Sequence, residues 1–179
     1  VTDEEGRKRS LERKLRTSLE KNFELPENTF ARAEDGKTNL FCGSIGSETV
    51  VKAKEQKTAF AVECAVRIDA LPESDNAGYA IRFAENANGF CELRVNLPRR
   101  TLVISELRNG NGKELFRKEN FFFTSLDFHN FRLEVSETSA TLWIDSGLYT
   151  SAQLTPEKGS VSVRVNNVNA SLNGLLIES

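Results

Sequence analysis

Polar side chains that recur at every second position are the residues of this sequence best suited to bind a ligand. Glu92, Arg94 and Asn96 alternate with apolar residues, and Arg82 stands between two apolar neighbours in the same way. In a β-strand this alternation places the four polar side chains on a face away from the core. Carboxylate, amide and guanidinium groups form paired hydrogen bonds with adjacent sugar hydroxyls. The spacing predicts a carbohydrate-binding sheet face, with a solvated, salt-bridged outer surface as the alternative.

The following segment repeats the pattern. Glu106 and Arg108 alternate with Val103, Ser105 and Leu107, and we expect the two charged residues to extend the same face.

Trp143 is the only tryptophan, and it lies with Asp145 on the outward side of an alternating run. If their strands are neighbours, Arg132 and Arg164 stand beside them. An aromatic ring packs against the apolar face of a sugar, while a carboxylate binds its hydroxyls. Three roles for Trp143 are open at this point: a sugar platform, a cover for the N-terminal helix, or an anchor against a neighbouring domain.

Metal and thiol chemistry have less support in the sequence. Oxygen-bearing side chains cluster in the turn formed by residues 69–76, where Asp69 and Asp75 are the candidate calcium ligands, accompanied by Glu73 and Asn76. An ordinary acidic turn is the alternative, and no other cofactor is expected.

The cysteines are too few and too scattered for a zinc site. They are Cys42, Cys64 and Cys91, without C-x-x-C spacing, and His129 is the only histidine. A zinc site or a Cys/His nucleophile therefore lacks ligands. We expect buried free thiols, with one bridged pair as the alternative.

Composition limits the partners. The chain has 179 residues, a net charge of −2 and a pI near 5.7, which argues against nucleic acid and against an anionic membrane surface. Neither an apolar run long enough to span a membrane nor a signal peptide is present in this sequence. We expect a soluble chain that is part of a larger protein.

The elements that must position these residues fall into two regions. Residues 1–22 are highly charged and carry Leu11, Leu15 and Leu19 at a spacing of four. This spacing predicts a helical connector that packs on the rest of the chain, a β-sandwich by the argument below, or on another domain. A basic amphipathic membrane helix is the alternative.

Residues 23–179 alternate between apolar and polar positions, with frequent turn residues. The sequence Asn109-Gly-Asn-Gly112 indicates a hairpin. The remaining segments predict strands at 28–33, 38–44, 48–53, 58–69, 78–84, 89–96, 101–108, 113–117, 130–136, 140–145, 148–154, 160–166 and 170–177. So many strands in one domain predict two packed sheets.

Several of these segments carry a family resemblance. The runs 58–68, 78–83, 88–94, 131–135, 141–145 and 159–164 follow one another as in concanavalin A-like lectin/glucanase sandwiches, which the chain resembles from about residue 24 to its end. The stretch 132–156 is similar to the C-terminal sandwich of family 32 glycoside hydrolases and to related levan-binding modules. The resemblance implies an all-β, two-sheet antiparallel jelly roll with an N-terminal helix.

The same resemblance implies a carbohydrate-associated function in an extracellular or periplasmic protein. Glucanases of the family carry acidic residues at alternating positions of one strand, and this sequence has no such triplet. We therefore expect a non-catalytic carbohydrate-binding module beside a neighbouring domain of a parent protein. The alternatives are an accessory domain that buttresses a glycoside hydrolase without binding sugar, and a glycan-cleaving enzyme of the same fold.

Overall fold

The computed structural model describes residues 2–70, 72, 74–122 and 126–179 of the chain. In these residues one helix, α1 (Thr2–Leu19), precedes fourteen strands. The strands are β1 (Phe23–Glu24), β2 (Thr29–Glu34), β3 (Lys37–Gly43), β4 (Glu48–Ala53), β5 (Phe60–Ile68), β6 (Gly78–Asn86), β7 (Gly89–Asn96), β8 (Thr101–Arg108), β9 (Asn111–Lys118), β10 (His129–Val135), β11 (Ser139–Ile144), β12 (Gly147–Gln153), β13 (Ser160–Asn166) and β14 (Asn169–Glu178).

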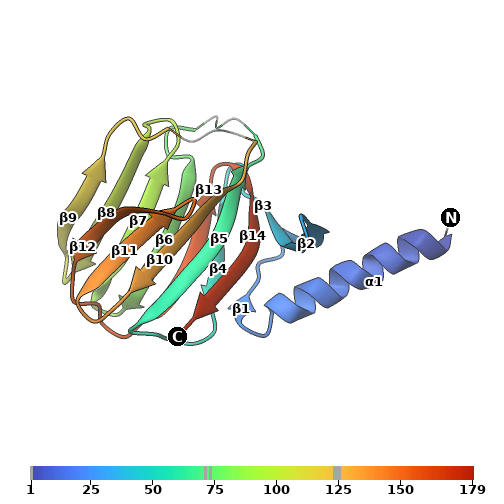
Figure 1. The fold of residues 1–179 in the computed structure, drawn as a ribbon, viewed down its shortest axis with the longest axis horizontal. Coiled ribbons are helices and arrows are strands. Elements are labelled where there is room, and N and C mark those ends of the chain that lie inside the picture. Colours follow the sequence, from blue (N-terminus) through green and yellow to red (C-terminus); the bar gives the residue numbers. More distant parts are fainter. Residues whose placement is uncertain (1, 71, 73, 123–125) are drawn as a thin grey trace.

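Two antiparallel sheets of seven strands pack face to face (Figure 1). Sheet A has the strand order β1-β4-β13-β6-β7-β8-β9, and sheet B has the order β12-β11-β10-β5-β14-β3-β2. Strands β6 to β9 and β10 to β12 follow one another as hairpins. The late strands β13 and β14 instead insert between earlier ones. The architecture is the all-β, two-sheet sandwich with an N-terminal helix that the sequence predicts.

The core lies between the sheets because alternate residues of each strand point inward. Phe131, Leu133 and Leu142 of sheet B and Val163 and Val165 of sheet A are all buried. Aromatic rings connect the two sheets: Tyr79 packs on Phe131, with 5.2 Å between the ring centroids, and Phe60 packs on Phe83, with 5.9 Å. Both pairs meet edge to face, the geometry that the ring quadrupole favours.

The predicted hairpin after Arg108 is present with a shorter turn. Arg108 pairs with Asn111, so Asn109 and Gly110 alone form the turn, and both have positive φ, 50° and 78°. Asn and Gly are the residues that tolerate this conformation in two-residue hairpin turns. The next two residues, which the sequence suggests as turn, begin β9.

Helix α1 docks through its C-terminal end, while the rest extends away from the sandwich (Figure 1). Leu15 and Leu19 pack against the core, but Leu11 is 48% exposed. The Arg16 guanidinium fastens this end by donating to the Thr29 carbonyl at 2.7 Å and to two further backbone carbonyls. Of the three leucines spaced by four, only Leu15 and Leu19 therefore pack on the sandwich. Within the described residues, no helix combines the length and the apolar character needed to cross a membrane.

Candidate functional site

A charged network occupies the outer face of sheet A. Glu92 on β7 lies between Arg82 on β6 and Arg94 on β7. The Nε of Arg82 donates to one Glu92 oxygen at 2.8 Å, and the Nε of Arg94 donates to the other at 2.7 Å. The Glu92 side chain is 8% exposed, whereas those of Arg82 and Arg94 are 19% and 33% exposed. Three of the predicted site residues therefore meet in one cluster.

The network continues across two more strands. Arg82 Nη1 donates to Glu85 at 3.3 Å, and Arg164 Nη2 on β13 donates to the same Glu85 oxygen at 3.4 Å. Arg164 Nη1 then reaches Glu48 on β4 at 2.9 Å. We call these six residues the sheet A network: Arg94, Glu92, Arg82, Glu85, Arg164 and Glu48. Its three guanidinium groups and three carboxylates balance in charge.

The ionised form of Glu92 is the stable one in this setting. Burial by itself would raise the pKa of Glu92, but the hydrogen bonds and charges of Arg94 and Arg82 together lower it. Burial by itself would lower the pKa of Arg82, but the hydrogen bonds and charges of Glu92 and Glu85 outweigh this effect and raise it. Glu92 and Arg82 therefore stabilise each other in their charged forms.

An apolar patch adjoins the network. The guanidinium carbon of Arg82 lies 3.9 Å from the centre of the Phe90 ring, a cation–π contact. Phe90 pairs across the sheet with Leu107, which is 36% exposed. The outer face of sheet A therefore offers hydrogen-bonding groups beside an aromatic and an aliphatic side chain, the combination that a sugar ring with polar edges and apolar faces requires.

Asn96 lies on the same face, but its side chain makes hydrogen bonds with the backbone near the end of its strand. Its Oδ1 accepts a hydrogen bond from the Arg99 backbone N–H at 2.9 Å, and its Nδ2 donates to the Asp75 carbonyl at 3.1 Å. Asn166, unlike Asn96, contacts the network: its side-chain oxygen accepts a hydrogen bond from Arg94 at 3.3 Å.

Glu106 and Arg108 do not extend the charged face, contrary to the sequence expectation. On β8 the core-facing positions are Leu102 and Ile104, and the same alternation turns Glu106 and Arg108 inward at the end of the sandwich. There the Cys91 thiol donates to Glu106 at 3.6 Å, and Arg108 Nη2 donates to the Ala84 carbonyl at 2.9 Å. The outward residues of β8 include Val103 and Leu107.

Trp143 and Asp145 belong to the opposite side of the molecule. Trp143 pairs with Arg132 in sheet B, whereas Arg164 lies in sheet A, so the expected grouping with Arg164 is wrong. Asp145 follows β11 in a turn, where it accepts from the Asn130 backbone N–H at 2.8 Å and contacts His129 Nδ1 at 2.9 Å. The six predicted residues therefore do not form one site.

Trp143 also does not cover the helix. Helix α1 packs on β2, at one edge of sheet B, while β11 lies near the other edge with four strands between them. Of the three roles considered for Trp143, the sugar platform and the domain anchor remain as hypotheses.

The acidic turn is engaged in local hydrogen bonds. Asp69 accepts from Arg67 Nε and from the Ser171 hydroxyl, both at 2.7 Å, and the Asn76 side chain accepts from the Ser74 hydroxyl at 2.7 Å. Glu73 lies outside the described residues. Among the residues that are described, no three His, Cys, Asp or Glu side chains gather as metal ligands. Calcium binding at Asp69 and Asp75 stays a prediction.

The three cysteines are buried free thiols, as expected. Burial raises the pKa of Cys42 and of Cys64 to about 12 and that of Cys91 to about 11. Because the thiolate is the reactive form, these groups are poor nucleophiles in the folded chain.

Sequence reasoning missed Phe90 and several members of the network. Phe90 shares the outward face of Glu92 by the same period-two count and could have been found by it. Glu85 lies beyond an irregularity in the pairing of β6, which disturbs the count. Glu48 and Arg164 come from distant segments, and only the strand order shows that Arg164 lies beside Arg82 and that Glu48 lies beside Arg164.

Solved structures of known proteins share the two-sheet fold of this chain. The carbohydrate binding module CBM66 from Bacillus subtilis superposes with a TM-score of 0.64 at 12% identity, covering 85% of this chain and 92% of that one. The Caenorhabditis elegans galectin LEC-6 has a TM-score of 0.58 at 9% identity, covering 85% and 96%. The Bacillus licheniformis beta-glucanase has a TM-score of 0.57 at 11% identity, covering 88% and 86%. No protein-family model matches the chain, and no curated protein matches it by sequence.

These similarities define the class of fold. The chain has the jelly-roll sandwich fold of these structures, the fold that the resemblance predicts. Carbohydrate-binding proteins and glucanases both use this fold, so function has to be argued from the side chains.

Proposed function

We propose that the chain is a non-catalytic carbohydrate-binding module and that the outer face of sheet A binds a neutral glycan. The observation that carries the proposal is the cluster of Arg82, Glu92 and Arg94 beside the Phe90 ring. The carbohydrate binding module and the galectin of the same fold support it as a class. By resemblance we place the module in an extracellular or periplasmic parent protein with a neighbouring domain.

The two arginines keep donors available for a ligand. Among the described residues, Arg82 uses Nε toward Glu92 and Nη1 toward Glu85, and its Nη2 donates no hydrogen bond. Arg94 is one-third exposed. A guanidinium group carries five N–H donors, about half of which each arginine still offers to sugar hydroxyls.

The network is also fixed before a ligand arrives. Glu92 is held on both oxygens, and Arg82 is held by Glu85 and Phe90 as well. Side chains that are already ordered lose little conformational entropy on binding, which favours affinity. Because the charges of the network balance, a neutral polyhydroxyl ligand fits it better than an ionic one.

The titration behaviour of the acids favours binding over catalysis. A glycosidase needs a carboxyl group with a raised pKa as its general acid. Every described carboxyl group whose pKa is displaced is displaced downward, by hydrogen bonds and charges that outweigh burial; they are Glu34, Glu63, Glu92, Asp145 and Glu157.

The test is a glycan array followed by titration of the best neutral ligand with Arg94→Ala. Loss of charge-assisted hydrogen bonds predicts an affinity about 10- to 100-fold lower. Phe90→Leu, which leaves the ion pairs in place, should also weaken binding. The control is Arg32→Ala, because Arg32 is half-exposed and ion-paired on the far edge of sheet B.

Thermal unfolding of each variant separates loss of binding from loss of fold. Retention on no glycan, or equal affinity of Arg94→Ala and the unmodified chain, would refute the proposal and favour the accessory-domain alternative.

A further inference from the structure

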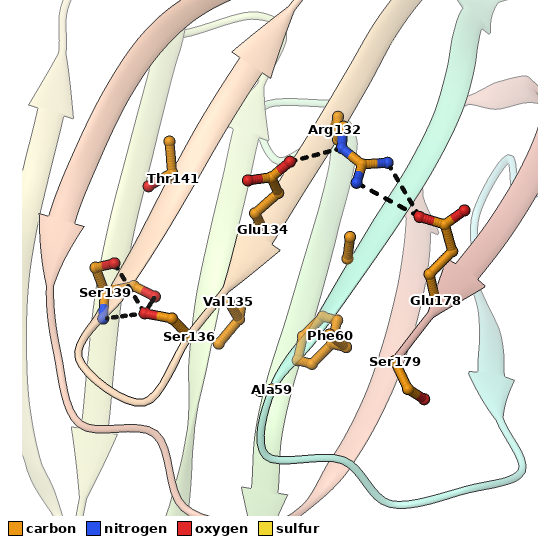
Figure 2. A pocket seen from close by; sticks show the side chains of 11 residues that line it. Ala59, Phe60, Arg132, Glu134, Val135, Ser136, Ser139, Thr141, Glu178 and Ser179 are labelled. Carbon is orange, nitrogen blue, oxygen red and sulfur yellow. Dashed lines mark hydrogen bonds and ion pairs between the residues drawn. The ribbon is translucent and has the colours of Figure 1, made fainter.

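A pocket lies on the outer face of sheet B, on the side of the sandwich opposite the sheet A network (Figure 2). Strands β5, β10, β11 and β14 contribute its walls. Phe60 and Val135 also line it, but their side chains are buried in the core between the sheets. Arg132, Glu134 and Glu178 form one side of the rim.

Arg132 is surrounded by carboxylates at this rim. Its Nε donates to Glu134 at 2.8 Å, its Nη1 to Glu63 at 3.1 Å, and its Nη2 to Glu178 at 3.4 Å. One guanidinium group contacts three carboxylates here, whereas the sheet A network has equal numbers of the two groups. The hydrogen bonds that Arg132 donates to Glu134 and Glu63 raise its pKa, so it keeps its positive charge.

Two of the carboxylates retain free acceptor capacity. Asn130 and Arg132 occupy both oxygens of Glu63. In contrast, one oxygen of Glu134 and one of Glu178 have no hydrogen bond among the described residues, and these side chains are 46% and 51% exposed. Figure 2 shows both beside Arg132 at the pocket.

Hydroxyl groups line the other side of the pocket. Ser136 and Ser139 lie with their Oγ atoms 3.0 Å apart, and the Thr141 hydroxyl lies 2.9 Å from that of Ser151. Each hydroxyl both donates and accepts. A matching ligand therefore needs its own hydroxyl groups on this side and a positive charge toward Glu134 and Glu178.

We propose that this pocket is a second binding site, specific for a glycan with unacylated amino groups. The protonated amine binds Glu134 and Glu178 through charge-assisted hydrogen bonds. The hydroxyls of the sugar bind the serine and threonine side. This site is separate from the neutral-glycan site and does not depend on it.

The test is isothermal titration calorimetry of the full chain with a fully deacetylated glucosamine oligomer, at a mildly acidic pH where the amines are protonated. The N-acetylated oligomer of the same length keeps the rings and most polar groups but not the charge. We expect the acetylated oligomer to bind about tenfold more weakly or not at all. Added salt should weaken binding of the deacetylated oligomer, because half-exposed charges are screened.

Two double variants of equal charge locate the site. Glu134→Gln with Glu178→Gln should lower the affinity for the deacetylated oligomer about tenfold or more. Glu114→Gln with Glu119→Gln removes the same charge from two glutamates that pair with Arg117 on β9, and should leave the affinity unchanged. All four positions are at least partly exposed, and thermal unfolding confirms that each variant folds.

Three results would overturn the proposal: no binding of the deacetylated oligomer, equal binding of the acetylated one, or an equal loss in the two double variants. The last would show a response to net charge alone. Failure here leaves neutral-glycan binding and its Arg94→Ala test unaffected, and failure of that test leaves this site standing.

Discussion

Glu92→Gln tests whether the sheet A network contributes to stability as its burial indicates. The amide of glutamine keeps the shape of the Glu92 side chain but has only one acceptor oxygen. One of the two hydrogen bonds from the arginines, at 2.7 and 2.8 Å, is therefore lost, and an amide N–H₂ group faces a guanidinium group in its place. A hydrogen bond to a charged group contributes about 1.5–3 kcal/mol. Both arginines keep other partners, which limits the cost of breaking a buried pair. We expect a loss of about 2–3 kcal/mol in the free energy of unfolding, or about 5–10 °C in Tm.

The loss should depend on pH with a definite sign. The pKa of Glu92 is lower in the folded chain than in the unfolded one. Its ionised form therefore stabilises the fold above the unfolded-state pKa of about 4.3, and this stabilisation disappears as the pH falls through the lower folded-state value. The two proteins should differ fully at neutral pH and converge in strong acid.

Urea unfolding followed by tryptophan fluorescence, repeated over a pH series, measures both effects. Glu114→Gln is the control, because Glu114 is 49% exposed and pairs only with the exposed Arg117, so its urea midpoint should not change. A Glu92→Gln midpoint equal to that of the unmodified chain, or a difference that does not vary with pH, would show that the network is not coupled to folding as described.

Two further predictions concern other parts of the fold. Arg16→Ala removes the hydrogen bonds that fasten α1, so trypsin should cleave the helix severalfold faster while the sandwich unfolds at nearly the same temperature; unchanged cleavage would contradict this role. Burial raises the pKa of Cys42 and Cys64 to about 12, so a thiol reagent should modify them only as urea unfolds the chain, and rapid modification in the native state would contradict their burial.

Local patterns in the sequence were sufficient for β2 to β14, though not for the two-residue β1, and for the faces of several side chains. Alternation over 89–96 correctly places Glu92 and Arg94 outward, because successive side chains of any strand point to opposite faces. The same rule finds the hairpin at Asn109, since few residues accept its backbone conformation.

Alternation does not say which of the two faces is the core. On β8 both sets contain apolar and polar residues, and Glu106 and Arg108 were assigned to the wrong face. In the structure, Leu102 and Ile104 fix the orientation of the strand. A pattern confined to one strand gives no information on that choice.

The lateral order of strands is also absent from local patterns. Arg164 is far from Arg82 in the sequence, yet β13 lies beside β6, and Arg164 joins the network through Glu85. The pocket on sheet B likewise combines Glu178 with Glu134 through β5 and β10. Long-range pairing decides both sites.

The late insertion of β13 and β14 has a consequence for the order in which the chain can fold during synthesis. Before residues 160–178 emerge, β4 and β6 have no strand between them in sheet A, and β3 and β5 have none in sheet B. Each sheet then consists of two separate ladders with open edges, which are prone to wrong pairing. Such long-range topologies fold slowly. A ribosome-bound chain should therefore stay open to proteases and chaperones until residues 160–178 have emerged.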